Sequence, residues 1–204
     1  MMVKICGITN CEDAMAAVRG GASALGFNFY PGSPRYITPD AAAGIIGILP
    51  APVLKVGVFV NETAAAVGAT AARAGLDVAQ LHGEESSSGW PHGLRIWRAL
   101  RAHESFRPEN LSSVEAEAVL LDAPAENTFG GTGRSWDWSR VAVRPPESPK
   151  LILAGGLDAG NVREAIRAAR PWGVDACSRL EARPGVKDHA RLAAFLKAAL
   201  SVDL

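Results

Sequence analysis

Short apolar runs alternate with alanine-rich segments along the whole chain, and this alternation constrains the fold more than any other feature. Several runs are too continuously apolar for a sheet with one wet face, which is typical of strands buried on both sides of a parallel sheet. The segments between them carry helical spacing. The expected strands are residues 3–6, 24–29, 54–60, 78–81, 96–100, 119–121, 151–154 and 174–177, and the expected helices are 12–18, 40–48, 63–73, 161–169 and 189–200.

Eight expected strands interleaved with helices leave two layouts, a closed (β/α)8 barrel or an open doubly wound sheet. The count of eight favours the barrel, although 204 residues is near the short end for that fold. Pro108 interrupts any long helix in residues 101–117, so we expect a reduced helix after strand 5. No shift in composition marks a boundary. We therefore expect an α/β fold, a single compact (β/α)8 TIM barrel domain spanning residues 1–204.

The charge balance and the cysteine count exclude several classes of protein. Lysine plus arginine and aspartate plus glutamate number 21 each, which argues against a broadly basic nucleic-acid binder and leaves room for a local phosphate site. Three cysteines without a CxxC pair suggest neither a disulfide framework nor a zinc site. The start of the chain lacks an apolar signal core, and no run approaches the roughly 20 apolar residues of a membrane span. We expect a cytoplasmic protein with no nucleic-acid and no membrane partner.

Two titratable residues stand where strands end, the place at which functional groups gather in parallel α/β folds. Cys6 ends the first strand and Asp122 the sixth, so they would face each other across a barrel mouth. A thiolate of lowered pKa serves as a base and a carboxyl of raised pKa as an acid, which suits an isomerase. The alternatives are a small buried cysteine and a carboxylate that caps a helix or pairs with a cation. Cys11 and Cys177 are expected to be inert.

A phosphate site is predicted after the last two strands. Gly155 and Gly156 follow strand 7 directly, and Asn161 opens a helix soon after. Glycines let backbone N–H groups approach an anion, and a helix N-terminus adds a favourable dipole. Residues 178–187, after strand 8, would supply the other half, as in many barrels. The alternative for the glycine pair is a tight turn.

The other polar candidates lie in loops. Arg35 follows Pro-Gly-Ser-Pro, where a guanidinium would hold a carboxylate bidentately, unless it is an ordinary solvated arginine. His82 is expected to be structural or to orient substrate. Gly130-Gly131-Thr132-Gly133 resembles a mobile lid, and Trp136 and Trp138 are expected to pack below a loop.

Ordered motifs across nearly the whole chain resemble the phosphoribosylanthranilate isomerase family of tryptophan biosynthesis. Each motif is weak alone, but the ordered set is highly specific. The motifs are Lys4-Ile5-Cys6-Gly7-Ile8-Thr9, Gly26-Phe27-Asn28-Phe29-Tyr30-Pro31-Gly32-Ser33-Pro34-Arg35-Tyr36, Val56-Gly57-Val58-Phe59-Val60-Asn61, Gln80-Leu81-His82-Gly83-Glu84, Leu121-Asp122 with Gly130-Gly131-Thr132-Gly133, Trp136-Asp137-Trp138, Leu153-Ala154-Gly155-Gly156-Leu157 and Pro184-Gly185-Val186-Lys187-Asp188.

The resemblance implies a (β/α)8 barrel that converts N-(5-phosphoribosyl)anthranilate to its 1-deoxyribulose isomer by an Amadori rearrangement. It implies no metal and no organic cofactor, a phosphosugar-anthranilate substrate, and a monomer or a homodimer. By motif position, Cys6 corresponds to the base that removes the proton from C2 of the sugar, and Asp122 to the acid that protonates the ring oxygen. The resemblance also implies the substrate-binding residues. Arg35 contacts the anthranilate side, and the phosphate cradle consists of Gly155, Gly156 and Ser178. The remaining substrate-binding residues are His82, Asp175 and Arg179.

One motif departs from the family pattern. The family commonly reads Asp-x-Ser-Ser-Gly-x-Glu after strand 8, whereas this chain has Cys177 and Arg179 at the first serine and the glycine. If that position needs a positive φ, Arg179 carries backbone strain of order 1 kcal/mol; alternatively its guanidinium supplements the phosphate site. Two rivals remain: the histidine-pathway sugar isomerase, which has an aspartate where this chain has Cys6, and a phosphate-binding barrel without catalysis.

Overall fold

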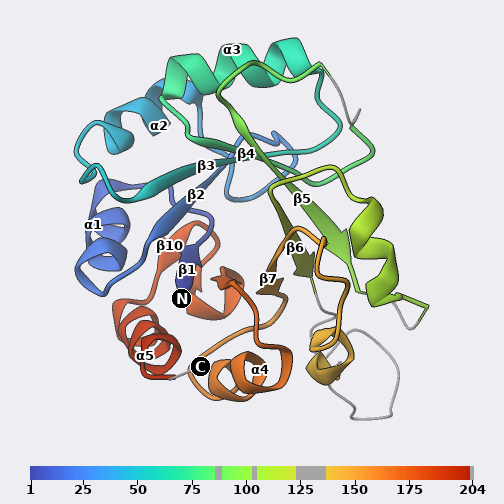
Figure 1. Ribbon diagram of the computed structural model, residues 1–204. Coiled ribbons are helices and arrows are strands. Elements are labelled where there is room, and N and C mark those ends of the chain that lie inside the picture. The colour runs from blue at the N-terminus through green and yellow to red at the C-terminus, as the bar shows by residue number, and fades with distance from the viewer. Residues whose placement is uncertain (86–88, 103–104, 123–136, 203–204) are drawn as a thin grey trace.

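Eight parallel strands close into a barrel in which each strand pairs with the next and β8 pairs with β1 (Figure 1). This computed structural model describes residues 1–85, 89–102, 105–122 and 137–202. All eight strands expected from the apolar runs are present, which confirms the barrel over the open sheet. The strands are β1 (Met2–Ile5), β2 (Ala24–Asn28), β3 (Leu54–Phe59), β4 (Val78–Leu81), β5 (Arg95–Arg101), β6 (Ala118–Asp122), β7 (Lys150–Ala154) and β8 (Gly173–Ala176).

The five expected α-helices are also present, and local capping explains where several begin. Asn10, Thr38 and Thr63 each accept a backbone N–H of the first turn with a side-chain oxygen, which satisfies a donor that has no partner inside the helix. Pro39 stands in the first turn of its helix, where its missing N–H costs nothing. The helices are α1 (Cys11–Arg19), α2 (Pro39–Ile46), α3 (Ala64–Ala74), α4 (Val162–Ala169) and α5 (His189–Leu200).

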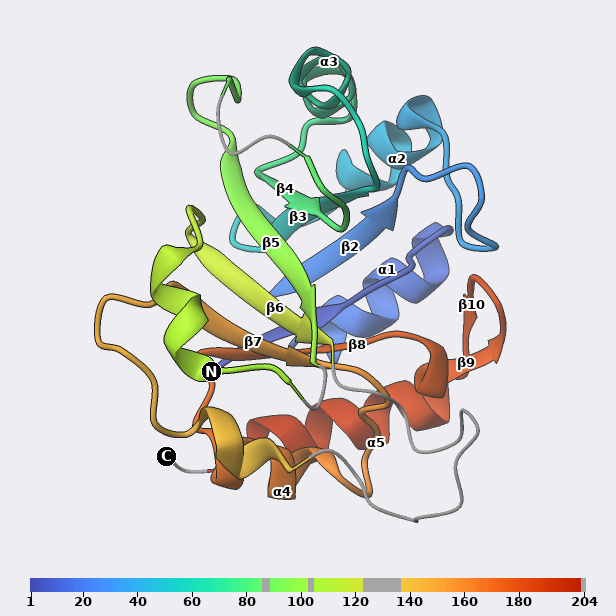
Figure 2. The same cartoon turned by 90° about the vertical axis from the view of Figure 1, so that its right-hand side faces the viewer.

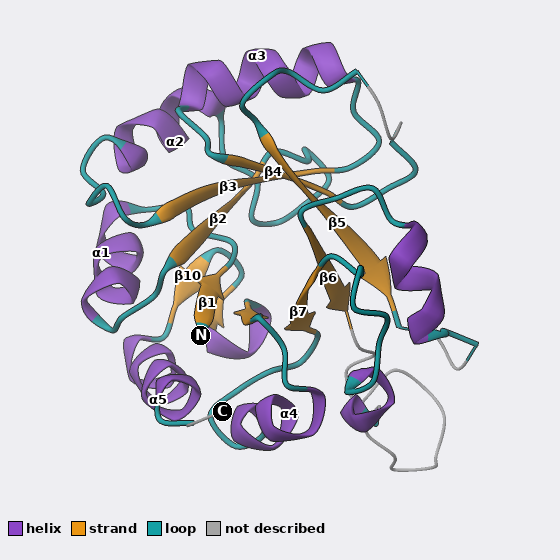
Figure 3. Cartoon of the chain, in the orientation of Figure 1, coloured by secondary structure: helices purple, strands orange, loops and turns teal. Residues whose placement is uncertain are grey.

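The barrel fits a short chain because three of its connections lack a full α-helix in the described residues. After β5 the chain forms only the 3₁₀ helix η1 (Pro108–Ser113), which confirms the reduced helix. The shortening goes further than expected. In Figure 3 the described residues between β4 and β5 form loop, and those between β6 and β7 include only the 3₁₀ helix η2 (Trp138–Val141). The expected lid Gly130-Gly131-Thr132-Gly133 and Trp136 lie outside the described residues; Trp138 is buried, as a packing residue should be.

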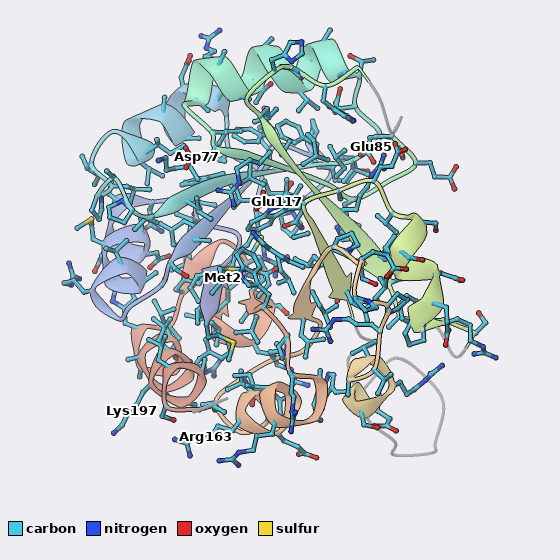
Figure 4. All side chains as sticks on the ribbon, in the orientation of Figure 1. Met2, Asp77, Glu85, Glu117, Arg163 and Lys197 are labelled. Carbon is cyan, nitrogen blue, oxygen red and sulfur yellow. The ribbon has the colours of Figure 1, made fainter. Side chains whose placement is uncertain are left out.

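The core has two layers because side chains alternate between the faces of a strand. The larger layer lies between the strands and the helices. The smaller one fills the barrel interior, where Trp97 is fully buried and meets Trp172 edge to face. Figure 4 shows Met2 in the middle of the barrel, whereas Arg163 and Lys197 point outward from α4 and α5. The buried interior residues are Met2, Ala24, Val56, Val78, Trp97, Ala99, Ala118, Leu120, Ile152 and Ala154.

The carboxyl ends of the strands define the mouth of the barrel. In Figure 2 the arrowheads of β2, β6 and β7 point towards the side on which the antiparallel hairpin of β9 (Glu181–Arg183) and β10 (Val186–Lys187) lies. That hairpin follows β8 through the 3₁₀ helix η3 (Ser178–Leu180). Among the described helices, none is both long enough and apolar enough to cross a bilayer.

Candidate active site

Strand alternation directs Cys6 and Asp122 into the barrel mouth. Met2 belongs to the interior layer, so Lys4 and Cys6, at steps of two along the chain, face the same side. In β6, Leu120 is an interior residue and Asp122, the last of the strand, follows by the same step. Both titratable groups therefore stand inside the rim at the carboxyl ends of their strands, as expected.

Below Cys6 lies a buried ion pair between the first and last strands. Lys4 Nζ donates to Asp175 Oδ1 at 3.0 Å, and the two side chains are 0% and 9% exposed. The same ammonium group is close enough to Cys6 to favour the thiolate form of that side chain. Lys4 thus stands between a carboxylate and the Cys6 thiol. Asp175, expected among the substrate-binding residues, is instead placed under the mouth, where its carboxylate holds Lys4.

Glycine at position 26 leaves the space that this arrangement needs. A Cβ on Gly26 would lie 2.7 Å from Cys6 Sγ and 3.1 Å from Lys4 Cε, closer than such atoms normally approach. The neighbouring strand β2 can therefore pass close to the thiol only because this residue has no side chain.

The surroundings of Cys6 favour its thiolate. A hydrogen bond from the Cys177 thiol lowers the pKa of Cys6 well below its ordinary value, and the ammonium groups of Lys4 and Lys187 lower it further against the opposing effect of burial. Burial raises the pKa of Asp175 to about 7, and the nearby Cys6 thiolate adds to the rise. For Lys4, burial disfavours the charged form, but the two anions outweigh it and raise the pKa of its ammonium group.

Asp122 has the opposite bias. Burial raises the pKa of Asp122, and the electrostatic effects of His82 and Arg101 offset this only in part. The half-buried His82 follows β4 and Arg101 ends β5, so two neighbouring strands present cationic or ionisable groups towards this carboxyl. A base of lowered pKa and an acid of raised pKa at one mouth is the pattern expected of acid/base catalysis.

A second charged cluster joins the loop after β2 to the segment after β8. Arg35 donates from Nε and Nη2 to the two carboxylate oxygens of Glu181 at 2.8 Å and 2.6 Å. Lys187 Nζ, whose side chain is fully buried, lies 3.1 Å from Glu181 Oε1 and 3.8 Å from Cys177 Sγ. Burial works to raise the pKa of Glu181, but Arg35 and Lys187 outweigh it and hold that pKa below its ordinary value. Arg35 is therefore a paired residue of the rim, not a solvated one.

The expected phosphate cradle lies in the two loops after β7 and β8. Gly155 and Gly156 have φ of +88° and +63°, a conformation that glycine adopts without cost and that turns successive N–H groups towards one side. Ser178 opens η3 in the other loop. Arg179 Nη1 lies 3.9 Å from Asp158 Oδ2, which brings the two loops together.

The backbone strain considered for Arg179 is absent. The described non-glycine residues with positive φ are Asn61 and Arg170, so the 3₁₀ turn of η3 accommodates Arg179 without a left-handed conformation. Its guanidinium is about half exposed and stays close to Asp158.

Sequence reasoning missed several groups of the site, although one of them left a clear signal. Lys4 interrupts an otherwise apolar strand, and a lone lysine in such a strand needs a buried anion. Cys177 was expected to be inert but affects the pKa of Cys6. Glu181 and Lys187 stood in motifs that the sequence analysis quoted, but no role was assigned to either residue. Within the described ranges, no three His, Cys, Asp or Glu side chains are grouped so as to hold a metal ion.

We predict that Lys4→Met lowers the free energy of unfolding by about 3–5 kcal/mol, because it leaves the Asp175 carboxyl buried without a cation. The double variant Lys4→Met/Asp175→Leu, which replaces both partners with apolar groups, should recover most of that loss. Urea unfolding followed by circular dichroism measures both. As a control, Arg73→Met breaks an ion pair with Asp40 whose side chains are 64% and 68% exposed and should cost far less. A Lys4→Met protein as stable as the parent would contradict the role of this pair.

Known proteins that are similar to this chain point to one family. The family model of N-(5'-phosphoribosyl)anthranilate isomerase matches residues 3–198. The isomerase of Solibacter usitatus is 48% identical over 199 residues, covering 98% of this chain and 97% of that protein. The solved phosphoribosyl anthranilate isomerase of Thermus thermophilus has a TM-score of 0.85 at 36% identity and covers 98% of this chain and 99% of its own. A solved isomerase in complex with reduced 1-(o-carboxyphenylamino)-1-deoxyribulose 5-phosphate has a TM-score of 0.83 at 37% identity, covering 99% of this chain and all of its own. The chain belongs to the N-(5'-phosphoribosyl)anthranilate isomerase family.

Proposed function

We propose that this chain converts N-(5-phosphoribosyl)anthranilate to 1-(2-carboxyphenylamino)-1-deoxyribulose 5-phosphate, with Cys6 as the base and Asp122 as the acid. Family membership supports the reaction. The two roles are supported by one observation: at the same barrel mouth, the pKa of Cys6 is lowered and the pKa of Asp122 is raised. A solved relative holds a reduced form of this product, which agrees with the proposed chemistry.

The reaction then runs as an internal transfer of protons. Asp122 donates a proton to the ring oxygen of the ribose as the bond from C1 to that oxygen breaks, and the anilino nitrogen supplies the electron pair for a C=N bond. The Cys6 thiolate removes the proton from C2, and the electrons of that bond form C1=C2 and neutralise the nitrogen. Protonation at C1 and loss of the C2 hydroxyl proton give the ketone. Atoms and electrons balance without any external oxidant.

Substrate binding uses the groups around these two. We propose that Gly155, Gly156 and Ser178 hold the phosphate, because the left-handed glycines and the opposed 3₁₀ turn offer backbone donors, and that Arg179 adds positive charge. Arg35 uses two of its five N–H groups on Glu181 and keeps the others for the anthranilate carboxylate. His82 lies beside Asp122, where it orients the sugar.

The thiol chemistry also bears on where the protein acts. The proposed base is a free cysteine, which stays reduced in the cytoplasm, so we place the enzyme there. All proposed site residues come from one chain within a single barrel domain, so the reaction needs no second copy, and a monomer or a homodimer serves equally.

The histidine-pathway sugar isomerase is the nearest alternative, since the fold and the rearrangement are similar. The thiol at the end of β1 speaks against it, because Lys4, Cys177 and Lys187 all favour a thiolate at that position. Replacing Cys6 with aspartate would add a second carboxylate above Asp175.

Loss of anthranilate-type fluorescence on addition of freshly prepared substrate measures turnover. We predict that Cys6→Ala and Asp122→Asn each lower kcat by about 10²–10⁴-fold, the usual effect of removing a positioned base or acid. Cys11→Ala is the matched control, since Cys11 is exposed on α1 and should turn over like the parent. A parent protein that does not exceed the uncatalysed rate would overturn the proposed reaction, and a variant with near-normal kcat would overturn the role of that residue.

Arg35 has a separate expected effect. Truncation to alanine should raise KM more than it lowers kcat, because Arg35 binds substrate without moving a proton. Arg35→Lys keeps the charge but loses the planar fork and should recover only part of the affinity. Steady-state kinetics in the same assay separates the two constants. A fall in kcat with KM unchanged would contradict a binding role.

A further inference from the structure

Cys6 and Cys177 lie on neighbouring strands where the barrel closes. Strands β1 and β8 pair in parallel with Ile5 opposite Ala176, so the residue that follows each strand is a cysteine. Cys6 N donates to Ala176 O at 2.9 Å, which continues the pairing to this level. Lys4 and Asp175, two residues before the cysteines, meet inside the barrel, so the two cysteine side chains face the same interior. They are close enough for each to shift the pKa of the other.

The contact lies at a spacing that a disulfide tolerates. Neighbouring strands run about 4.7–4.9 Å apart, and disulfides join Cα atoms about 4.4–6.8 Å apart. Gly7 leaves room next to the pair, since a Cβ at that position would lie 2.9 Å from Cys177 Sγ. The spacing of neighbouring strands is therefore compatible with a disulfide between the two residues.

The charged groups around the pair suit thiol oxidation. Lys4 and Lys187 stabilise the Cys6 thiolate, and the thiolate is the nucleophilic form of cysteine. Cys177 Sγ lies 3.7 Å from Glu181 Oε1, an acceptor for its proton, and 3.8 Å from Lys187 Nζ, which stabilises the anion that remains. Both cysteines are half-buried residues at the mouth of the barrel. A low-pKa thiol next to a second thiol is the arrangement of redox-sensing cysteines.

We propose that a peroxide converts Cys6 and Cys177 to a reversible disulfide that takes Cys6 out of catalysis. The loss of activity rests on the proposed function of Cys6, whereas the disulfide itself does not. This reaction gives a role to Cys177, which stands at a position where the family commonly has serine. Cys177 forms the disulfide with oxidised Cys6 before Cys6 is oxidised further.

The chemistry needs only hydrogen peroxide or an organic hydroperoxide as oxidant. The Cys6 thiolate attacks the peroxide oxygen, an S–O bond forms as the O–O bond breaks, and the leaving hydroxide or alkoxide takes up a proton. Cys177 loses its proton to Glu181 and attacks the sulfenic sulfur. The S–S bond forms as the S–O bond breaks, and the departing hydroxide leaves as water with that proton. Two thiol sulfurs are oxidised, and one peroxide is reduced.

Peptide mapping of the full-length protein tests the bond directly. Trypsin leaves Cys6 and Cys11 together in peptide 5–19 and Cys177 in peptide 168–179, so the test uses a Cys11→Ser background. The reduced protein is treated with hydrogen peroxide, free thiols are blocked with N-ethylmaleimide, and the digest is analysed without reductant. We expect the two peptides to be joined, with an intact mass lower by two hydrogens, and dithiothreitol to separate them.

Activity and the Cys177→Ser variant complete the test. Peroxide should lower the activity of the Cys11→Ser protein at least about tenfold and dithiothreitol should restore it, because sulfenic acid and disulfide are reversible. In Cys11→Ser/Cys177→Ser, measured against its own untreated sample, excess peroxide should cause a loss that dithiothreitol does not restore, because nothing stops Cys6 from reaching the sulfinic acid.

The outcomes separate the two claims. If no cross-linked peptide forms while Cys6 is oxidised, the disulfide is wrong. If the cross-link forms in full but activity is unchanged, the disulfide stands and the catalytic role of Cys6 falls. If peroxide inactivation of the Cys177→Ser protein is as reversible as that of its parent, the protective role of Cys177 is wrong.

Discussion

A lysine–carboxylate pair buried inside the barrel, Lys4 with Asp175, is the interaction on which the site depends. Burying two charges costs several kcal/mol in desolvation, and such a pair is weak evidence for stability. The pair joins β1 to β8 where the barrel closes. It also holds the Lys4 ammonium group near the sulfur of Cys6. The thiolate at the mouth is thus a consequence of how the barrel closes.

Across the mouth, burial raises the pKa of Asp122 and so favours its protonated form. The same mouth therefore holds one group biased towards its anion and another biased towards its protonated form, since the pKa of each is set by its own surroundings. Around the rim, Glu181 binds Arg35 on one side and Lys187 on the other. This network fixes the loop after β2 against the hairpin after β8, and it places charged groups beside the Cys6–Cys177 contact.

Much of the fold could be predicted from local pattern, because buried parallel strands and amphipathic helices leave periodic traces. All eight expected strands and all five expected helices lie near the ranges expected from the sequence. Cys6 and Asp122 could be singled out because each stands at the end of an expected strand. Contacts between distant residues could not be predicted in this way. Lys4 meets Asp175 across 171 positions, and Arg35 meets Glu181 across 146, and only barrel closure brings them together. In the described residues after β4 and β6 there is no α-helix, and the sequence did not predict this.

We infer that the closing ion pair and its neighbours keep Cys6 ionised. Ultraviolet absorbance of the thiolate, titrated against pH as the difference between Cys11→Ser and Cys11→Ser/Cys6→Ala, measures this directly. We expect the Cys6 signal to titrate well below the roughly 8.5 of an ordinary thiol, because the Cys177 hydrogen bond and the two ammonium groups favour the anion. The same titration in Lys4→Met should move upward. A Cys6 that titrates at or above the ordinary value in the parent background would contradict the account.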